Sequence, residues 1–210
     1  MKQDRIRILV VDDHAMIRKG LTATIEPESD MEVVGSASTG KEAVEVFRAT
    51  KPDVTIMDLT LTPEMSGTEA IRAIKRESSK ARIIVLTAAK GDEDIHRALK
   101  AGAATYLLKD SLGDDLIPII REVHAGGGTV PPYVARKLVD RLSQSILTER
   151  EVDVLKVAAL GRRNKEIARS LGISEMTCQG HMKSILAKLK VQDRTEAVTV
   201  AVRRGIIHLE

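Results

Sequence analysis

Five short apolar runs separated by amphipathic stretches fill the first 125 residues, and this alternation constrains the fold more than any other feature of the chain. The apolar runs cover residues 6–11, 33–37, 54–59, 83–87 and 106–108. The amphipathic stretches, which we expect to be helices, cover residues 15–25, 40–48, 68–76, 93–101 and 114–124. Short, nearly continuous runs of Val, Ile and Leu are typical of strands buried on both faces of a parallel sheet. The pattern predicts a doubly wound α/β domain with five parallel strands.

The second part of the chain is predicted to be helical. Gly126 to Gly128, followed by Pro131 and Pro132, interrupts the alternation, so we interpret residues 126–145 as a linker that contains a short helix at 133–142. The predicted organisation is therefore a first domain at 1–125, this linker, and a small all-α domain at 146–210. Its helices are expected at residues 149–160, 164–171, 174–189 and 195–203.

Local signals mark where two of these helices begin. Thr148 and Glu151 have the spacing of a capping box, and Ser174 is a good N-cap residue after a tight turn at Gly172. Two helices joined by such a turn have helix-turn-helix spacing.

Charge is divided unevenly along the chain, although the net charge is only +3. Residues 1–128 contain 18 Lys and Arg against 21 Asp and Glu, whereas residues 129–210 contain 15 against 9. This division indicates an acidic first part and a second part attracted to polyanions. The single cysteine, Cys178, excludes an internal disulfide and is expected to be a packing residue. No signal peptide or membrane-length apolar run is visible, so a cytoplasmic protein without a membrane partner is expected.

Polar side chains follow four of the five predicted strands, at the edge where ligands of open parallel sheets bind. These residues are Asp12, Asp13, Asp58, Thr87 and Lys109. Clustered carboxylates repel one another unless a cation neutralises them, and hard oxygen ligands suit Mg²⁺. An aspartate in such a cluster can attack a phosphoryl donor and carry the group as an acyl phosphate. The sequence therefore predicts a phosphoryl site with Mg²⁺ as its cofactor.

The segments VVDDH (10–14), MDL (57–59), LTA (86–88) and GAATYLLKD (102–110) resemble the receiver domain of NarL/FixJ-type response regulators, which has a flavodoxin-like fold. The resemblance implies that Asp58 is the phosphoacceptor for a partner histidine kinase. It implies direct Mg²⁺ ligation by Asp13, Asp58 and the main-chain carbonyl of Thr60, with Asp12 acting partly through water. It also implies that Thr87 and Tyr106 are switch residues and that Lys109 contacts the phosphate. His14 is interpreted as a helix-start residue rather than a metal ligand.

One departure from the family pattern lies beside the predicted site. The family usually has proline four positions after the phosphoacceptor, whereas Pro63 comes five positions after Asp58. Either a bulge at residues 61–62 absorbs the extra residue, or the lifetime of the phosphoryl group or the geometry of signalling is altered.

Residues 147–198 resemble the LuxR-type DNA-binding domain. The resemblance implies that the helix at 174–189 enters the major groove of double-stranded DNA and that the helix at 195–203 forms a homodimer. Its base-facing positions are Gln179, Gly180 and Lys183. Candidates for phosphate contacts or local capping are Lys165, Thr177, His181, Lys188 and Lys190. The side chains expected to face the small core are Ile173, Met176, Ile185, Leu186 and Leu189.

Two recognition positions depart from the family pattern. Gln179 stands where many relatives carry lysine, and glutamine pairs in bidentate fashion with adenine rather than with guanine. Gly180 replaces a branched residue, and its missing side chain leaves room for a thymine methyl or a water. We therefore expect a shifted site preference rather than lost binding.

The sequence as a whole predicts a transcription regulator that is switched by phosphorylation of Asp58. A phosphorylation-independent regulator with an atypical receiver stays open, because of the loop insertion. An aspartate-nucleophile phosphohydrolase is disfavoured, since Thr60 stands where such enzymes need a second acid, and no enzyme activity is expected. A dinucleotide enzyme is disfavoured because the first strand runs into Asp-Asp-His rather than a glycine-rich loop.

Overall fold

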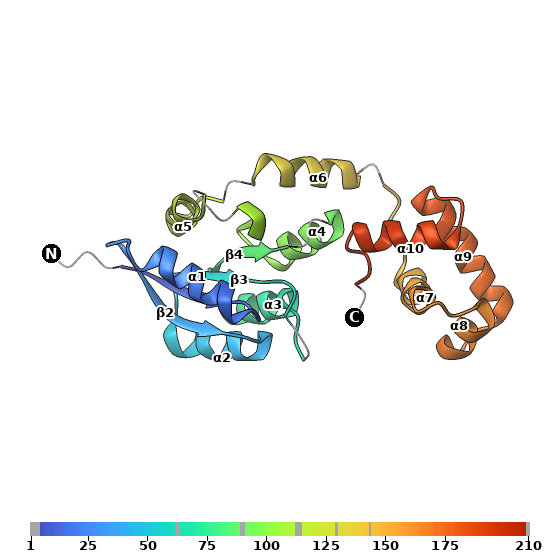
Figure 1. Ribbon diagram of the computed structural model, residues 1–210, viewed down its shortest axis with the longest axis horizontal. Helices are drawn as coiled ribbons and strands as arrows, with labels where there is room; N and C mark the ends of the chain where they lie inside the picture. Colours follow the sequence, from blue (N-terminus) through green and yellow to red (C-terminus); the bar gives the residue numbers. More distant parts are fainter. Residues whose placement is uncertain are drawn as a thin grey trace. The chain divides into compact units, whose positions relative to one another are not determined.

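The computed structural model describes residues 5–61, 64–88, 91–111, 115–128, 130–142 and 144–208. The chain divides into two compact units, one formed by residues 1–89 and 95–135 and the other by residues 90–94 and 136–210. Figure 1 labels most of the helices and strands of the two units.

The first unit is built on a five-stranded parallel sheet in the order β2-β1-β3-β4-β5. The strands are β1 (Ile6–Val11), β2 (Met31–Ala37), β3 (Val54–Met57), β4 (Arg82–Thr87) and β5 (Thr105–Leu108). The order turns back at β1, so the chain winds first toward one edge of the sheet and then toward the other. This topology confirms the predicted doubly wound α/β fold.

Helices cover both faces of the sheet. They are α1 (Ala15–Ile25), α2 (Gly40–Thr50), α3 (Gly67–Glu77), α4 (Asp92–Ala101) and α5 (Leu116–His124), and a 3-10 turn, η1, follows β5 at Lys109–Ser111. Leu21 of α1 and Ile120 of α5 share one apolar core with Ile8, Ile56 and Ile84 of the sheet. Alternate strand residues point to the other face, where α2 and α3 lie side by side (Figure 1).

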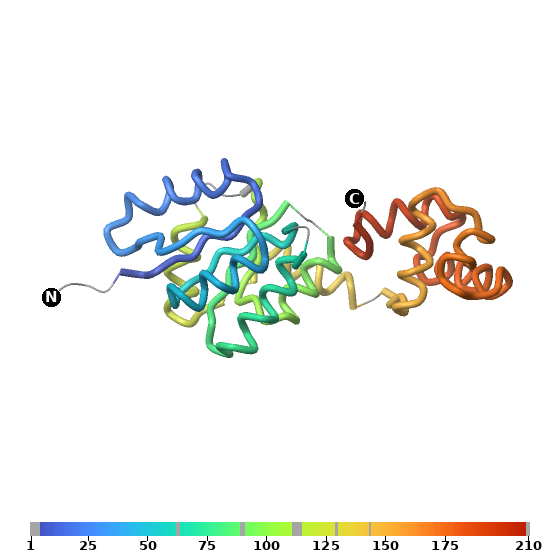
Figure 2. The backbone as a smooth tube through the Cα atoms, turned by 90° about the horizontal axis from the view of Figure 1, so that it is seen from below, coloured from blue at the N-terminus to red at the C-terminus, as the bar shows by residue number. Residues whose placement is uncertain are grey.

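The second unit contains α7 (Glu149–Ala159), α8 (Asn164–Leu171), α9 (Glu175–Leu189) and α10 (Arg194–Arg203), preceded by α6 (Pro132–Leu142), which begins in the first unit. Figure 2 shows α7 to α10 gathered around a common centre. That centre is a separate apolar core to which α7, α8, α9 and α10 all contribute side chains.

Local sequence signals account for where these helices start and stop. Thr148 and Glu151 form the predicted capping box at the start of α7. Gly172 ends α8 in the left-handed conformation, and the Ser174 hydroxyl caps α9 by accepting a hydrogen bond from the Thr177 amide. α8 and α9 therefore form the predicted helix-turn-helix. None of the helices in the described part of the chain has the length and apolar character needed to cross a membrane.

Candidate functional site

Asp12 and Asp58 lie next to each other in the sheet, directly after the neighbouring strands β1 and β3. The Asp58 amide donates a hydrogen bond to the Val11 carbonyl, and the Asp12 amide donates one to the Ala37 carbonyl, so the ladder fixes both main chains. Each residue is only 1% exposed. Two carboxylates buried this close together need a positive partner, because burial disfavours uncompensated charge.

Lys109 supplies that partner from the end of β5. Its Nζ lies 2.6 Å from Asp12 Oδ2 and 2.8 Å from Asp58 Oδ2. Burial alone would lower the pKa of Lys109, but the two paired carboxylates raise it above its ordinary value. One lysine thus faces two carboxylates, so the three side chains together keep a net negative charge.

The second oxygen of Asp58 is held by the loop after β3. Asp58 Oδ1 accepts hydrogen bonds from the Thr60 amide at 3.2 Å and from the Thr60 hydroxyl at 3.4 Å. The start of α3 contacts the same loop, where the Gly67 amide donates a hydrogen bond to the Leu59 carbonyl. Of the bulge predicted at residues 61–62, Leu61 is described and buried, whereas Thr62 and the following Pro63 lie outside the described residues.

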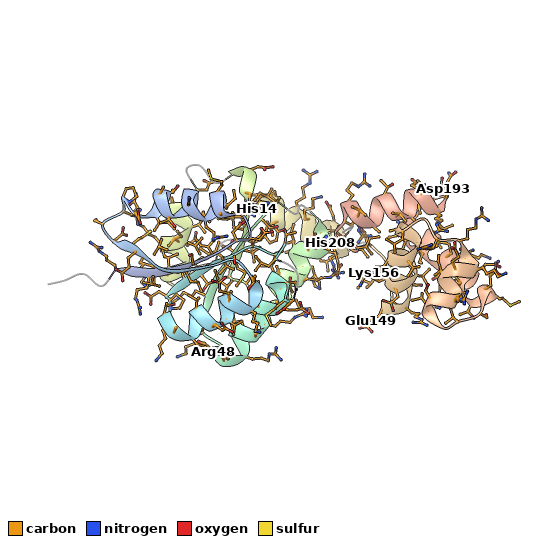
Figure 3. The ribbon with its side chains drawn as sticks, turned by 60° about the horizontal axis from the view of Figure 1, so that its bottom comes forward. His14, Arg48, Glu149, Lys156, Asp193 and His208 are labelled. Carbon is orange, nitrogen blue, oxygen red and sulfur yellow. The ribbon has the colours of Figure 1, made fainter. Side chains whose placement is uncertain are left out.

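Asp13 and His14 extend the acidic edge toward solvent. His14 Nδ1 lies 2.5 Å from Asp13 Oδ1 and 3.4 Å from Asp12 Oδ1, and these three side chains can offer ligand atoms within 4.8 Å of one another. His14 is the N-cap residue of α1, as the sequence indicates, and its side chain is exposed there (Figure 3). Among the described residues, Asp58 does not belong to this metal-compatible group. The structure therefore brings Asp58 to Lys109 and brings Asp13 to His14, with Asp12 next to both.

Sequence reasoning missed two residues that shape this edge. Arg18, one turn into α1, donates to the main-chain carbonyls of Asp12 and Asp13 and so holds the loop between β1 and α1. Gly67 lies so close to the loop after β3 that a Cβ atom there would be 1.9 Å from the Asp58 carbonyl oxygen. The position of Arg18, a basic residue on the helix that follows the acidic loop, could have indicated its role. No neighbouring residue in the sequence indicates the role of Gly67.

The two predicted switch residues are fully buried in the strands that lead to this edge. Thr87 ends β4 in register with Leu108, one residue before Lys109, and Tyr106 lies in the middle of β5. The Tyr133 hydroxyl, from the first turn of α6, donates to the Tyr106 carbonyl at 3.1 Å. Burial raises the pKa of Tyr133 to about 12, so this hydroxyl keeps its proton. A side chain from the predicted linker thus reaches β5, the strand at one edge of the sheet, and no feature of the sequence indicates this contact.

In the second unit, α9 presents most of the predicted DNA-binding residues on its surface. Gln179, Gly180 and Lys183 are exposed, as is Lys165 on α8. Lys190 is exposed at the end of α9, and His181 is half-buried. Thr177 is exposed but its hydroxyl contacts that of Ser174, which is the local capping role that the sequence left open.

Lys188 has an internal partner that the sequence did not suggest. Its Nζ lies 2.7 Å from Oε2 of Glu151, which is only 3% exposed, and the Ser184 hydroxyl donates to the other oxygen at 2.6 Å. Burial alone would raise the pKa of Glu151, but the bonds from Lys188 and Ser184 lower it to about 2. This ion pair joins the start of α7 to the end of α9.

Met176 corrects the predicted core. The buried side chains of α9 are Cys178, Met182, Ile185 and Leu189, which follow one another by three or four residues and form one stripe. Met176 precedes Cys178 by two residues, or about 200° around the helix, and therefore points away from the core. It is 81% exposed, so its assignment to the core was wrong. Cys178 is buried, in agreement with a packing role.

Both parts of the chain match family models. Residues 8–121 match the response regulator receiver domain, and residues 145–201 match the bacterial regulatory proteins of the luxR family. The response regulator protein VraR of Staphylococcus aureus (strain NCTC 8325 / PS 47) is 38% identical over 207 residues, which cover 96% of this chain and 99% of VraR.

Solved structures of similar proteins span both units. The response regulator ChrA of a heme-sensing two-component system is 32% identical, covers 97% of this chain and 99% of its own, and has a TM-score of 0.58. RcsB from Salmonella enterica serovar Typhimurium, solved bound to a promoter in the presence of the phosphomimetic BeF3−, gives a TM-score of 0.72 at 24% identity over 95% of this chain and 99% of its own, and shows the fold alone. Together with the two family matches, these likenesses place the chain among the response regulators that join a receiver domain to a LuxR-type DNA-binding domain and regulate transcription.

Proposed function

We propose that a partner histidine kinase phosphorylates this chain on Asp58 and that this phosphorylation controls how a homodimer of the chain binds double-stranded DNA. The observation that supports the proposal most directly is the buried contact of Lys109 with both Asp12 and Asp58. In this proposal a carboxylate oxygen of Asp58 attacks the phosphorus of the kinase phosphohistidine. The new O–P bond gives an acyl phosphate as the P–N bond breaks, and the kinase histidine leaves as a neutral imidazole that takes up a proton. Lys109 then balances the charge on the phosphoryl oxygens, while Thr87 and Tyr106 respond to it.

The donor set at this edge fits Mg²⁺. Asp12 and Asp58 share the single positive charge of Lys109, and Asp13 lies beside Asp12 at the same edge. We assign the ion to Asp12, Asp13, Asp58 and the main-chain carbonyl of Thr60, because hard oxygen ligands suit this cation. When bound, Mg²⁺ would neutralise the carboxylates and the incoming phosphoryl oxygens. The exposed His14 ring stays available to orient Asp13 rather than to bind a hard cation.

For DNA, we propose that α9 lies in the major groove with Gln179, Gly180 and Lys183 toward the bases. Their common exposure on one side of α9 supports this placement. Exposed Lys165 and Lys190, with half-buried His181, are proposed to contact phosphates, whereas Thr177 and Lys188 serve within the domain. The chain would act in the bacterial cytoplasm, where its DNA target lies, and as a regulator rather than an enzyme with a turnover substrate.

Phosphorylation can be tested with acetyl phosphate as a small donor. The full chain is incubated with acetyl phosphate and MgCl2, and its intact mass is measured before and after treatment with hydroxylamine, which cleaves acyl phosphates. We expect one phosphoryl group on the wild type, none on Asp58→Asn, and none when EDTA replaces the metal. Asp115→Asn is the matched control, since Asp115 is exposed in the same unit and its side chain does not cap α5.

The same preparations decide between control by phosphorylation and the phosphorylation-independent alternative. DNA affinity and sedimentation are compared with and without acetyl phosphate. An adduct that persists in Asp58→Asn contradicts the assignment of Asp58. Equal DNA affinity of the phosphorylated and unphosphorylated wild type would favour the alternative.

A further inference from the structure

The outward side of α9 carries Met176, an apolar residue that does not pack into the core of the second unit. Exposed positions Met176, Gln179, Gly180 and Lys183 are spaced by three or four residues and therefore line one side of the helix. Met176 leads this stripe in the first turn of α9 and is 81% exposed. On α9 it is the single large apolar side chain that is exposed; the other exposed members of the stripe are polar, or glycine. The N-terminal part of a recognition helix is the part that reaches base edges.

Gly180, one turn after Met176, leaves an open space on the same side. A Cβ atom added there would meet nothing within 4 Å, and its backbone has no left-handed conformation that requires glycine. Neither packing nor backbone geometry therefore explains the glycine, although glycine weakens a helix interior. The two positions together form an apolar step, with the flexible Met176 side chain beside the bare helix surface of Gly180.

The chemistry of the major groove indicates what such a step can recognise. Thymine is the base that presents an apolar group there, its 5-methyl, whereas the other base edges present hydrogen-bond donors and acceptors. Gln179 lies next to the step and can pair with adenine, and Lys183 places a positive charge one turn further along. A nucleic acid suits this surface better than an apolar protein segment, because the unit carries a net positive charge and glutamine and lysine adjoin the methionine.

We propose that Met176 is a specificity-determining residue of this regulator and that it selects a thymine in each DNA half-site by contact with the 5-methyl group, over the space left by Gly180. This inference rests on the proposed placement of α9 in the major groove. It adds a residue that the apolar pattern of the sequence placed in the core and that the family pattern does not assign to the DNA. A methionine is suited to the contact because its unbranched side chain adapts to an apolar surface.

The test uses the full-length protein and duplexes selected from a randomised library. Each thymine of the selected half-site is replaced in turn by deoxyuridine, which removes the 5-methyl and leaves base pairing intact. For the wild type we expect one position per half-site at which the replacement lowers affinity about fourfold, the loss expected for one buried methyl group. For Met176→Ala we expect the thymine and deoxyuridine duplexes to bind equally at that position.

Two further variants keep the result interpretable. Met16→Ala removes an equally exposed methionine from the other unit, and its preference for thymine should match that of the wild type. Gly180→Ala adds one methyl group to the step without a clash inside the protein, and it should weaken or remove the same preference. Because Met176 and Gly180 are both exposed on a helix, circular dichroism should show all three variants folded.

The outcomes separate this inference from the proposed function. The library could yield a selected site at which no deoxyuridine replacement lowers the affinity of the wild type, or at which the replacement lowers the affinities of Met176→Ala and the wild type equally. Either result means that Met176 does not recognise thymine, although α9 still binds DNA. If the library yields no preferred sequence, the proposed placement of α9 fails and this inference fails with it.

Discussion

At the scale of single residues, two glycines of the receiver differ in what surrounds them. Gly67 starts α3 against the loop after β3, where a Cβ atom would lie 1.9 Å from the Asp58 carbonyl oxygen and 2.7 Å from the Leu59 Cα. Gly20 lies in the middle of α1, where a Cβ atom would meet nothing within 4 Å. The same substitution should therefore have opposite effects at the two positions.

We expect Gly67→Ala to destabilise the receiver by about 1 to 3 kcal/mol, because main-chain atoms must move to admit the methyl group. The shift displaces Asp58, so phosphorylation by acetyl phosphate should slow as well. Gly20→Ala should raise stability by about 1 kcal/mol, because alanine favours a helix interior, and should leave phosphorylation unchanged. Urea unfolding and the rate of phosphoryl incorporation measure both effects, and an unchanged rate in Gly67→Ala would contradict the role given to this glycine.

At the scale of secondary-structure elements, side chains of one element that hydrogen-bond or ion-pair with another element hold each unit together. In the DNA-binding unit, Glu151 caps the first turn of α7 and at the same time pairs with Lys188 near the end of α9. Arg194 at the start of α10 donates to the Ala158 carbonyl at the end of α7. In the receiver, the Tyr133 hydroxyl of α6 donates to the Tyr106 carbonyl of β5, the strand at one edge of the sheet.

The Glu151 ion pair predicts a pH dependence of stability. Its pKa of about 2 in the folded protein is below its ordinary value of 4.5, so its contribution is complete above pH 4.5 and is lost as the pH falls toward 2. The difference corresponds to about 3 kcal/mol in the free energy of unfolding. We expect Glu151→Gln to be destabilised at neutral pH and to lose this part of the pH dependence.

Glu149→Gln is the matched control for that experiment. Glu149 lies two residues earlier at the exposed start of α7 (Figure 3), and its removal should cost only the small helix-dipole contribution. Chemical unfolding of the full chain between pH 7 and 3 gives the comparison. If Glu151→Gln loses stability with falling pH as steeply as the wild type does, the ion pair is not the source of the dependence.

At the scale of the whole molecule, acidic and basic side chains are concentrated in different parts of the chain. Residues 1–128 carry three more acidic than basic side chains, whereas residues 129–210 carry six more basic than acidic ones. The acidic part suits a site that gathers carboxylates around a cation, and the basic part suits contact with a polyanion. The small net charge of the whole chain conceals both properties.

We expect the affinity of the full chain for duplex DNA to fall steeply with salt, because bound lysines displace counterions from the phosphates. Lys165→Gln and Lys190→Gln should each reduce the slope of log affinity against log salt by about 1 per bound protomer. Lys41→Gln, an exposed lysine on α2 of the receiver, should leave the slope unchanged. Fluorescence anisotropy at several salt concentrations measures the slopes, and equal slopes for all three variants would remove Lys165 and Lys190 from the interface.

The sequence by itself determined most elements and the identity of the residues at the carboxyl edge. α1 and α8 begin and end at the predicted residues, because apolar period and capping signals act within a few positions of the chain. The strand predicted at 54–59 ends instead at Met57, since the apolar Leu59 after Asp58 does not show where the ladder stops. That Asp12, Asp58 and Lys109 lie near one another follows from parallel strands ending at one edge.

Only the tertiary structure decided which of these groups touch and which side of a helix is buried. Lys109 pairs with both Asp12 and Asp58, a choice that depends on three strands far apart in the sequence. Asp13 contacts its neighbour His14 instead. The apolar pattern of α9 gives a period of three or four residues but not its phase, since Met176 and Cys178 are both apolar. Packing against α7 and α8 selects the stripe that contains Cys178, and this choice leaves Met176 facing outward.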